Sequence, residues 1–338
     1  MVPVETMSEQ TSAFPADWNA TVASYPSGTI FHTREWLELL QATQGAVPLI
    51  ESFEIDGYQG WHVAAMIKKG PFKILGSPIP GWTTVRMGPL FDPQQVDQAK
   101  LAESIKQFAK RNGASMIELA HEQLDAEAMG AAGFDRQPDG TFVVDLPDDP
   151  EALWDVFKST ARNRVRKGRK NGLTVELGVD DKLVDDVWEK VDAIFRHQNL
   201  VVPYDRQRVQ EVYNRLAPAG RVAGIRVLAP DGHVAACGIF PHDDDTIYFW
   251  AGASSAEDRA LVPNELMHFE IMSHAIELGL KRYDMCGGGD YKKKFGAHEV
   301  KNPHWVHYGN PVAKLGRATM ARAVQLKRSI AARKATRS

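Results

Sequence analysis

The sequence predicts a mixed α/β fold built from two similar units, and three observations lead to that prediction. The chain has 338 residues, which corresponds to two domains at about 100–200 residues per domain. Helical patterns alternate with strand hairpins in both halves, an order typical of mixed α+β sheets rather than of a doubly wound parallel sheet. The segment Pro147–Pro150 lies near the middle of the chain and forms a natural joint between the units.

The first unit opens with a helix and continues mainly as strands. Thr33 is a candidate N-cap for a helix that runs to about Ala42. The strands Val47–Ile55 and Tyr58–Lys68 follow, joined by Asp56-Gly57, a dipeptide typical of hairpins. We expect the other elements to be a strand at Phe72–Leu75, a long loop at Gly76–Pro93, a helix at Pro93–Asn112, a strand at Ser115–Leu119, a helix at Leu124–Ala132 and one or two strands within Gly133–Leu146.

The second unit follows a similar order of elements without repeating the residues of the first. Its clearest turn is Pro230-Asp231-Gly232, which joins two strands. We expect helices at Glu151–Asn171, Asp180–Asn199, Asp205–Leu216 and Asn264–Leu278, and strands at Leu173–Gly178, Arg221–Leu228, Val234–Phe240, Thr246–Ala253, Arg282–Cys286 and His304–Tyr308. The predicted domains are therefore residues 1–147 and 148–310, followed by a basic helix or tail at residues 311–338.

The composition excludes several classes of protein. A chain that is 43% hydrophobic and 25% charged is neither disordered nor collagen-like. Two cysteines, Cys237 and Cys286, are too few for a disulfide framework, so we expect a reducing compartment. Met1–Phe14 lacks the pattern of a secretory signal, and no apolar run reaches the roughly 18–20 residues of a membrane span. The prediction is a cytoplasmic protein.

The charge is distributed unevenly along the chain. The total is −3, but residues 300–338 contain nine Lys or Arg and no Asp or Glu. Residues 1–299 therefore carry 31 basic and 43 acidic side chains, a net charge of −12. The tail alternates basic residues with apolar ones such as Leu315, Met320 and Leu326, a pattern typical of a surface-seeking helix. Two interpretations stay open for residues 312–338: peripheral contact with the inner face of a membrane, or a solvated helix.

Several standard signatures of function are missing from the sequence. It contains no G-x-S-x-G elbow, P-loop, G-x-G-x-x-G fingerprint, H-E-x-x-H or paired C-x-x-C motif. This disfavours serine hydrolases, P-loop kinases, dinucleotide oxidoreductases and zinc proteases. His298, His304 and His307 gather late in the chain, but His304 and His307 would face opposite sides of one strand. We predict no metal site.

Two segments carry most of the chemical signal. In the first, Lys158–Lys170, seven basic residues fall on one predicted helix, either as a solvated face or as an anion site. In the second, Arg282–Gly296, a strand runs into three glycines and then a tyrosine and three lysines. The glycines permit close approach of a ligand, and the lysines could neutralise phosphate. The alternative is a flexible turn with a solvated basic patch. Asp284 could be a buried carboxylate of raised pKa or a hydrogen-bonded core residue.

The order of these segments resembles a known family. The relevant stretches are M-G-P-L-F-D at Met87–Asp92, F-V-V-D-L at Phe142–Leu146, the basic helix S-T-A-R-N-R-V-R-K, and R-Y-D-M-C-G-G-G-D-Y-K-K-K-F-G at Arg282–Gly296. Together they resemble the FemAB-like branch of the GNAT acyltransferase superfamily, whose best-known members are the Fem peptidoglycan aminoacyl transferases. The resemblance covers about residues 25–310. It implies two tandem GNAT-like domains packed side by side, with the donor lying between two splayed strands, here Thr246–Ala253 and Arg282–Cys286.

The resemblance also implies the co-substrates. No cofactor is expected to be tightly bound, and an acyl-CoA or another activated acyl donor is the expected co-substrate. The stretch Ser254–Pro263, which would cradle the pyrophosphate of CoA, has no glycine, and this puts acetyl-CoA in doubt. The stretch Asp180–Leu216 is too short for the long helical arm of many Fem enzymes, so the resemblance permits aminoacyl-tRNA as donor but does not imply it.

Candidate site residues follow from the two segments and from the resemblance. Asp284 and His298 are candidate bases for the attacking amine, and Tyr291 is a candidate acid for the leaving group. The candidate binding residues are Arg34, Trp36, Trp82, Arg86, Trp250, Arg259, Asn264, Lys292, Lys293 and Lys294. By analogy with the family, the first four of these would line a groove between the domains and bind the acceptor.

The functional hypotheses are ranked in the same way. The first is an N-acyltransferase that joins an acyl or aminoacyl group to a primary amine, forming an amide in cell-envelope or related metabolism. The second is an aminoacyl-tRNA-dependent transferase that acts on a peptidoglycan precursor. The third is a non-catalytic GNAT-like module that docks to a membrane or a partner. The partners implied are a donor and an amine acceptor, with tRNA and acyl carrier protein both open as donors.

Overall fold

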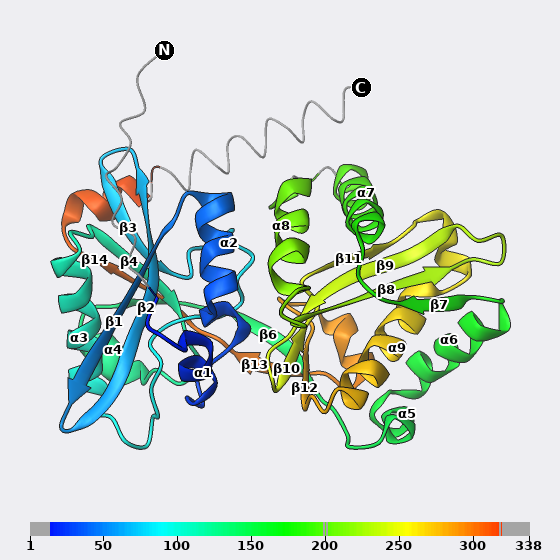
Figure 1. The fold of residues 1–338 in the computed structure, drawn as a ribbon, viewed down its shortest axis with the longest axis horizontal. Helices are drawn as coiled ribbons and strands as arrows, with labels where there is room; N and C mark the ends of the chain where they lie inside the picture. The colour runs from blue at the N-terminus through cyan, green and yellow to red at the C-terminus, as the bar shows by residue number, and fades with distance from the viewer. Residues whose placement is uncertain (1–13, 199, 201, 318, 320–338) are drawn as a thin grey trace, which may run out of the picture.

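The computed structural model describes residues 14–198, 200, 202–317 and 319, and these form two bodies that lie side by side (Figure 1). Helix α2 (Arg34–Gln44) of the first body packs against helix α8 (Arg206–Leu216) of the second. One hydrophobic core cluster contains residues of both bodies, among them Trp36, Trp82 and Trp250. The two halves of the chain therefore share a packed interface.

The first body is built on a six-stranded sheet. The strands are β1 (Val47–Ile55), β2 (Tyr58–Lys69), β3 (Phe72–Ser77), β4 (Met116–Ala120), β5 (Asp135–Gln137) and β14 (His304–Tyr308), in the order β1-β2-β3-β4-β14-β5. Its other helical elements are α1 (Trp18–Ala23), η1 (Ile30–His32), α3 (Gln98–Arg111) and α4 (Ala126–Ala131). Thr33 caps α2 as predicted, with its hydroxyl accepting from the Trp36 amide. The predicted Asp56-Gly57 hairpin is confirmed.

The second body contains two four-stranded sheets. One has the order β10-β12-β6-β13 and comprises β10 (Thr246–Tyr248), β12 (Arg282–Asp284), β6 (Gly140–Asp145) and β13 (His298–Lys301). The other has the order β11-β9-β8-β7 and comprises β11 (Ala251–Ser254), β9 (Val234–Pro241), β8 (Val222–Leu228) and β7 (Thr174–Leu177). The remaining helices are α5 (Leu153–Val156), α6 (Ser159–Lys170), α7 (Asp181–His197) and α9 (Pro263–Glu277), with short turns η2 (Pro150–Ala152), η3 (Glu257–Ala260) and η4 (Asp290–Phe295).

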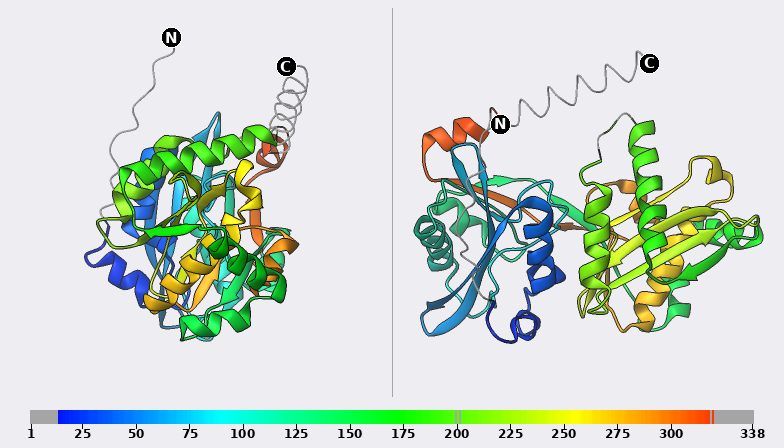
Figure 2. Two further views of the ribbon diagram at one scale, coloured as in Figure 1. Left: turned by 90° about the vertical axis from the view of Figure 1, so that its right-hand side faces the viewer. Right: turned by 45° about the horizontal axis from the view of Figure 1, so that its top comes forward.

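Strands cross between the two halves of the sequence. Strand β14, from the end of the chain, pairs with β4 and β5 of the first body, where Figure 1 shows its orange-red colour among the blue and cyan strands. Strand β6, from the first half, pairs with β12 and β13 of the second body. Figure 2 shows these crossing segments between the bodies. The domain limits 1–147, 148–310 and 311–338 stay a prediction, and the hydrogen-bonded sheets extend across the first two.

The structure corrects four predicted elements. The predicted helix Glu151–Asn171 is interrupted at Phe157, whose extended backbone (φ −75°, ψ 137°) ends α5 before α6 begins. The predicted strand Thr246–Ala253 is divided into β10 and β11, which belong to different sheets. Helix α3 begins at Gln98 rather than near Pro93, because Asp97 accepts hydrogen bonds from the Ala99 and Lys100 amides and caps it there. Strand β13 and the turn η4 were not predicted.

The basic C-terminal segment falls only partly within the described residues. Residues 311–317 are helical, and most of the predicted helix from Pro311 to Ala335 lies outside the residues that the structure describes. Among the described helices, none has both the length and the apolar character needed to cross a bilayer.

Candidate active site

A cleft of about 730 Å³ lies between the two bodies, where two neighbouring strands diverge. Strands β10 and β12 run parallel and pair from Thr246 and Arg282 to Tyr248 and Asp284. Beyond that point β11 turns away and pairs with β9 in the other sheet. The predicted splayed pair is therefore present, and the opening between its arms forms part of the cleft.

Trp250 fixes the arm of the cleft formed by β11. Its amide donates to the Tyr248 carbonyl (2.8 Å), a tight turn that separates β10 from β11. Its indole Nε1 donates to the carbonyl of Thr83 (2.9 Å) in the loop of the first body, and its ring stacks on Tyr204 (5.1 Å between centroids). The divergence of the strands is thus held by side-chain contacts across the two halves, and Trp250 lines the cleft as one of its walls.

Lys292 holds the opposite arm. Its ammonium group donates to the carbonyls of Met285 (3.0 Å), Cys286 (2.7 Å) and Gly287 (2.8 Å). Burial lowers the pKa of this lysine, whose exposed fraction is only 3%. Cys286 and Gly287 have positive φ angles of 52° and 75°, so the chain here adopts a conformation that its sequence alone does not favour. All three ammonium protons of Lys292 are used to hold this turn.

Tyr291 is the accessible polar group of the motif. Its side chain lines the cleft and is 54% exposed, unlike the neighbouring Lys292. Burial of part of the ring raises the pKa of its phenol above the ordinary value of 10, so the group is neutral at physiological pH. A neutral phenol can donate a proton.

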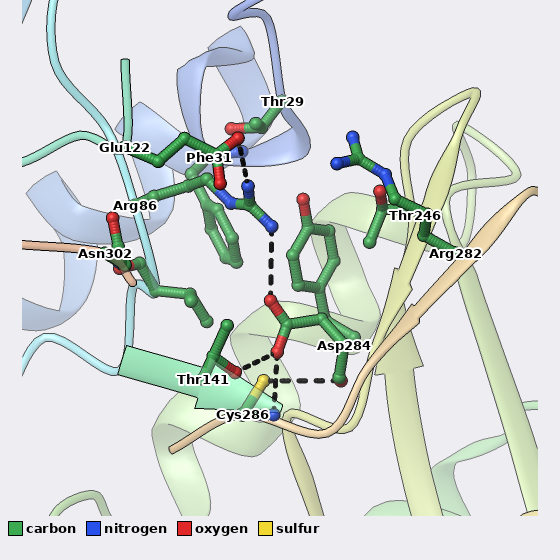
Figure 3. Close-up of polar contacts among 12 residues, drawn as sticks. Thr29, Phe31, Arg86, Glu122, Thr141, Thr246, Arg282, Asp284, Cys286 and Asn302 are labelled. Atoms are coloured by element: carbon green, nitrogen blue, oxygen red, sulfur yellow. Dashed lines mark hydrogen bonds and ion pairs between the residues drawn. The ribbon is translucent and has the colours of Figure 1, made fainter. Parts of the chain in front are cut away.

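Asp284 lies at the paired end of the strands and is completely buried (Figure 3). Its carboxylate accepts hydrogen bonds from the Thr141 hydroxyl and from the Cys286 amide (2.8 Å), and it forms an ion pair with Arg86 (3.2 Å). Arg86 in turn pairs with Glu122 (2.8 Å). Asp284 is not among the residues that line the cleft. Of the two interpretations of Asp284, the contacts support the hydrogen-bonded core residue.

A second, much smaller cavity of about 20 Å³ lies beside this buried cluster. Three buried polar atoms of its lining residues have no hydrogen-bond partner among the described residues: Arg86 Nε, His32 Nε2 and Gln123 Oε1. Burial lowers the pKa of His32 to about 4, so its ring is neutral at pH 7. A cavity of this volume with three polar groups has the size and polarity of a site for one water molecule.

The C-terminal segment also reaches the cleft. Arg317 donates to Glu118 (3.0 Å), which is buried and also bonded to the His304 ring (2.9 Å). Both Arg317 and His304 line the cleft. Asn302 lies beside them, and its amide donates to the Val85 carbonyl (2.7 Å), which ties the loop of the first body to the strands. The first residues of the basic tail are thus part of the cleft wall.

The structure brings only part of the predicted site together. Trp250, Tyr291 and Lys292 line the cleft, and Arg86 and Asp284 form the buried cluster beside it. The predicted residues that do not line the cleft are Arg34, Trp36, Trp82, Arg259, Asn264, Lys293, Lys294 and His298. Trp36 and Trp82 are core residues. His298 is about half exposed and lies near Asp145 (3.6 Å). Lys293 pairs with Asp290, and Lys294 pairs with the buried Glu265.

Residues 156–294 match the family model described as an acetyltransferase (GNAT) domain. The chain contains a GNAT domain. The solved structure of FemX has a TM-score of 0.73 to this chain at 16% identity, over 88% of this chain and 96% of FemX. A conserved protein of unknown function from Bacteroides thetaiotaomicron reaches 0.58 at 10% identity, over 86% and 96%. L-PGS from Bacillus licheniformis reaches 0.51 at 11% identity, also over 86% and 96%. No curated protein matches the chain.

At these identities the solved structures are evidence of fold alone. The mixed α/β fold with two units and the resemblance to the FemAB-like branch are confirmed. The GNAT domain includes the divergent strands, both arms of the cleft, and the turn held by Lys292. The first body and the segment after residue 294 supply the rest of the lining.

The GNAT domain carries negative charge where a CoA pyrophosphate would be expected. The connection from β11 to α9 contains Glu257 and Asp258, and Asp258 is bonded to His233 (3.0 Å). In the first turn of α9, the carboxylate of Glu265 is buried and accepts from Lys294 (2.7 Å) and Arg164 (3.3 Å). A carboxylate therefore already occupies the positive end of the helix. These residues do not fit a diphosphate at that position.

Sequence reasoning missed one wall of the cleft and its amide. Val191, Ile194 and Phe195 of α7 and Tyr204 line the cleft, and none was predicted to do so. The apolar periodicity of α7 was visible, but a residue that faces a cavity has the same pattern as one that faces the core. Asn302 precedes a proline between two short strands, and only the fold brings it next to Val85.

Proposed function

We propose that this protein is an N-acyltransferase that moves an acyl group from an activated donor to a primary amine and so forms an amide. The observation that carries the proposal is the cleft at the divergence of β11 from β12 within a GNAT domain. The cleft has a volume typical of small-molecule sites and is closed by the other body. GNAT domains as a class use an acyl-CoA co-substrate without a tightly bound cofactor. The donor of this protein is part of the proposal.

The proposed reaction places the donor carbonyl between the arms of the cleft. The nitrogen of a neutral amine attacks the carbonyl carbon, the bond to the leaving group breaks, and the amine loses a proton. Tyr291, a neutral phenol in the cleft, is placed to give its proton to the leaving group and regain one from the amine through solvent. Holding the two reactants in one cleft supplies a large share of the rate by itself.

The candidate bases receive different support. Asp284 is fully buried and its carboxylate already accepts from three donors, which leaves it poorly placed to take a proton from an amine. His298 is about half exposed near Asp145 and does not line the cleft. We therefore propose that deprotonation of the amine uses solvent, and that Asp284 and Arg86 keep β12 in position.

A second candidate function has a specific observation in its favour. On α6 the side chains of Lys158, Lys167 and Lys170 are exposed and have no acidic partner among the described residues. A basic face of this kind suits a tRNA, as an aminoacyl-tRNA-dependent transferase would require. Membrane or partner docking without catalysis stays a third hypothesis, which rests on the basic tail.

The test is a search for the amide product. The full chain is incubated with acyl thioesters, acylated carrier protein or aminoacyl-tRNA, each with a mixture of primary amines, and new amides are identified by mass spectrometry. The proposal expects an amide from a thioester or carrier donor. Amide formation only from aminoacyl-tRNA would establish the second function instead. A failure of all three donors to yield an amide would leave the non-catalytic module.

A further inference from the structure

The cleft is unusually poor in free charge, and this limits the acyl group that it can hold. The charged side chains among its described lining residues are Asp139, Lys292 and Arg317. Lys292 has given all its protons to three carbonyls, and Arg317 is paired with Glu118. Asp139 is exposed and accepts from the Gly140 amide. None of the three is a buried, unpaired charge that could bind a charged ligand.

The wall formed by the second body is apolar. Val191, Ile194 and Phe195 present the face of α7, and Ala251 and Ala253 present the face of β11. Helix α7 packs directly on β11, so these side chains form one continuous surface. Trp250 and Tyr204 extend it toward the loop of the first body. A group placed between the arms of the splayed strands would lie against hydrocarbon and aromatic rings.

The acyl and aminoacyl donors that remain open differ in one charge. An aminoacyl group carries an α-ammonium ion next to the carbonyl, and a simple acyl group does not. Burial of an ammonium ion without a counter-ion is strongly unfavourable. The nearest buried carboxylate on β12, that of Asp284, lies outside the cleft lining and is already paired with Arg86. The cleft thus lacks the partner that an aminoacyl group would need.

We infer that the donor carries an uncharged, apolar acyl group of several carbons, which binds against the wall formed by α7 and β11. This inference rests on the proposed acyl transfer and specifies its substrate class. It assigns Ile194 and Phe195 as residues that determine acyl specificity. It also explains why the GNAT domain can lack a free carboxylate in its cleft.

The test uses the full chain and a series of N-acetylcysteamine thioesters with acetyl, butyryl, hexanoyl, octanoyl and glycyl groups. Binding is measured by titration calorimetry. Each added methylene should tighten binding about fourfold up to octanoyl, as expected for burial of hydrocarbon. The glycyl thioester should bind no more tightly than the acetyl one. Affinity that is independent of chain length would overturn the inference. So would tightest binding of the glycyl thioester, which would instead identify the aromatic rings as an ammonium site.

Two variants locate the acyl site. Ile194→Asp introduces a charge into the apolar wall and should weaken octanoyl binding at least tenfold. Ala193→Asp places the same charge at the next position of α7, which is exposed and does not line the cleft, and should leave the affinity unchanged. Equal effects of the two variants would contradict the assignment. If Ile194→Asp fails to fold, Phe195→Asn is used, and the chain-length series on the unmodified protein decides in any case.

The same reagents separate this inference from the proposed function. Chain-length-dependent binding without any amide product would leave the apolar site intact and disprove acyl transfer. Amide formation at rates independent of chain length would support acyl transfer and disprove the apolar acyl site.

Discussion

The two regions on either side of the strand divergence use polar groups in opposite ways. Where β10 and β12 are paired, the charges of Asp284, Arg86 and Glu122 are buried and satisfied by one another. Where the strands separate, Tyr291 is exposed in a cleft whose charges are few and already paired. The comparison indicates that the ionic groups of this motif hold the strands apart, whereas the cleft itself binds by shape and apolar contact.

The largest expected effect comes from the buried side of this comparison. Asp284→Asn removes one partner of a buried ion pair and places an amide where three donors converge, so two donors face each other. The loss in the free energy of unfolding should be about 3 kcal/mol, at the lower end for buried pairs because Arg86 keeps Glu122. Urea denaturation of the purified variant measures it.

Asp290→Asn is the matched control for this variant. Asp290 belongs to the same motif but is exposed, and its ion pair with Lys293 lies in solvent. The same substitution there should change the free energy of unfolding by no more than about 0.5 kcal/mol. Equal losses in the two variants would mean that burial does not distinguish the two carboxylates. An Asp284→Asn protein of normal stability and no turnover would restore Asp284 as the base.

The fold could be predicted from the sequence to a large extent, because its signals are local. Thr33, Asp180 and Asp205 cap helices within three residues of their own position, and Asp56-Gly57 closes a hairpin by its own backbone preference. The break between β10 and β11 could not be predicted in this way. It depends on Trp250 reaching the Thr83 carbonyl, 167 positions away in the chain.

The site was less predictable for the same reason. The motif Arg282–Gly296 correctly indicated a turn, but the sequence gives no sign that Lys292 points inward and Lys293 outward. Burial is decided by the 3₁₀ geometry of η4 and by the carbonyls it meets. The crossing of β6 and β14 between the bodies is likewise a long-range pairing that neither strand's composition indicates.

A smaller effect is expected at the turn that forms one arm of the cleft. Lys292→Met keeps the length of the side chain but leaves the carbonyls of residues 285–287 without their donor. We expect a loss of about 2 kcal/mol in unfolding free energy and at least a tenfold fall in kcat/KM, since the arm would lose its fixed position. Lys293→Met removes only an exposed ion pair and should leave stability unchanged within about 0.5 kcal/mol.

The two lysine variants are compared by thermal unfolding and, once a product is known, by steady-state kinetics. A Lys292→Met protein with normal stability would show that the three carbonyls find other partners. A Lys293→Met protein that is the less stable of the two would reverse the assignment of inward and outward lysines.

The smallest effect on stability is expected at Tyr291, in the open part of the cleft. Tyr291→Phe removes a hydroxyl from a side chain that is 54% exposed, so the free energy of unfolding should change by less than about 0.5 kcal/mol. If the phenol donates a proton to the leaving group, kcat should fall about 10²–10⁴-fold at saturating substrate. The unmodified enzyme should then lose activity only above pH 10, because the pKa of Tyr291 is raised.

Tyr283→Phe provides the converse case on the buried side. Its hydroxyl bonds to the His268 ring (2.7 Å) within the core, so the variant should lose about 1 kcal/mol of stability and retain its turnover. The pair of variants therefore separates the two regions by two readouts at once. Tyr291→Phe with full kcat would assign the cleft a positioning role alone, because no other described side chain of the motif offers an unpaired proton donor there.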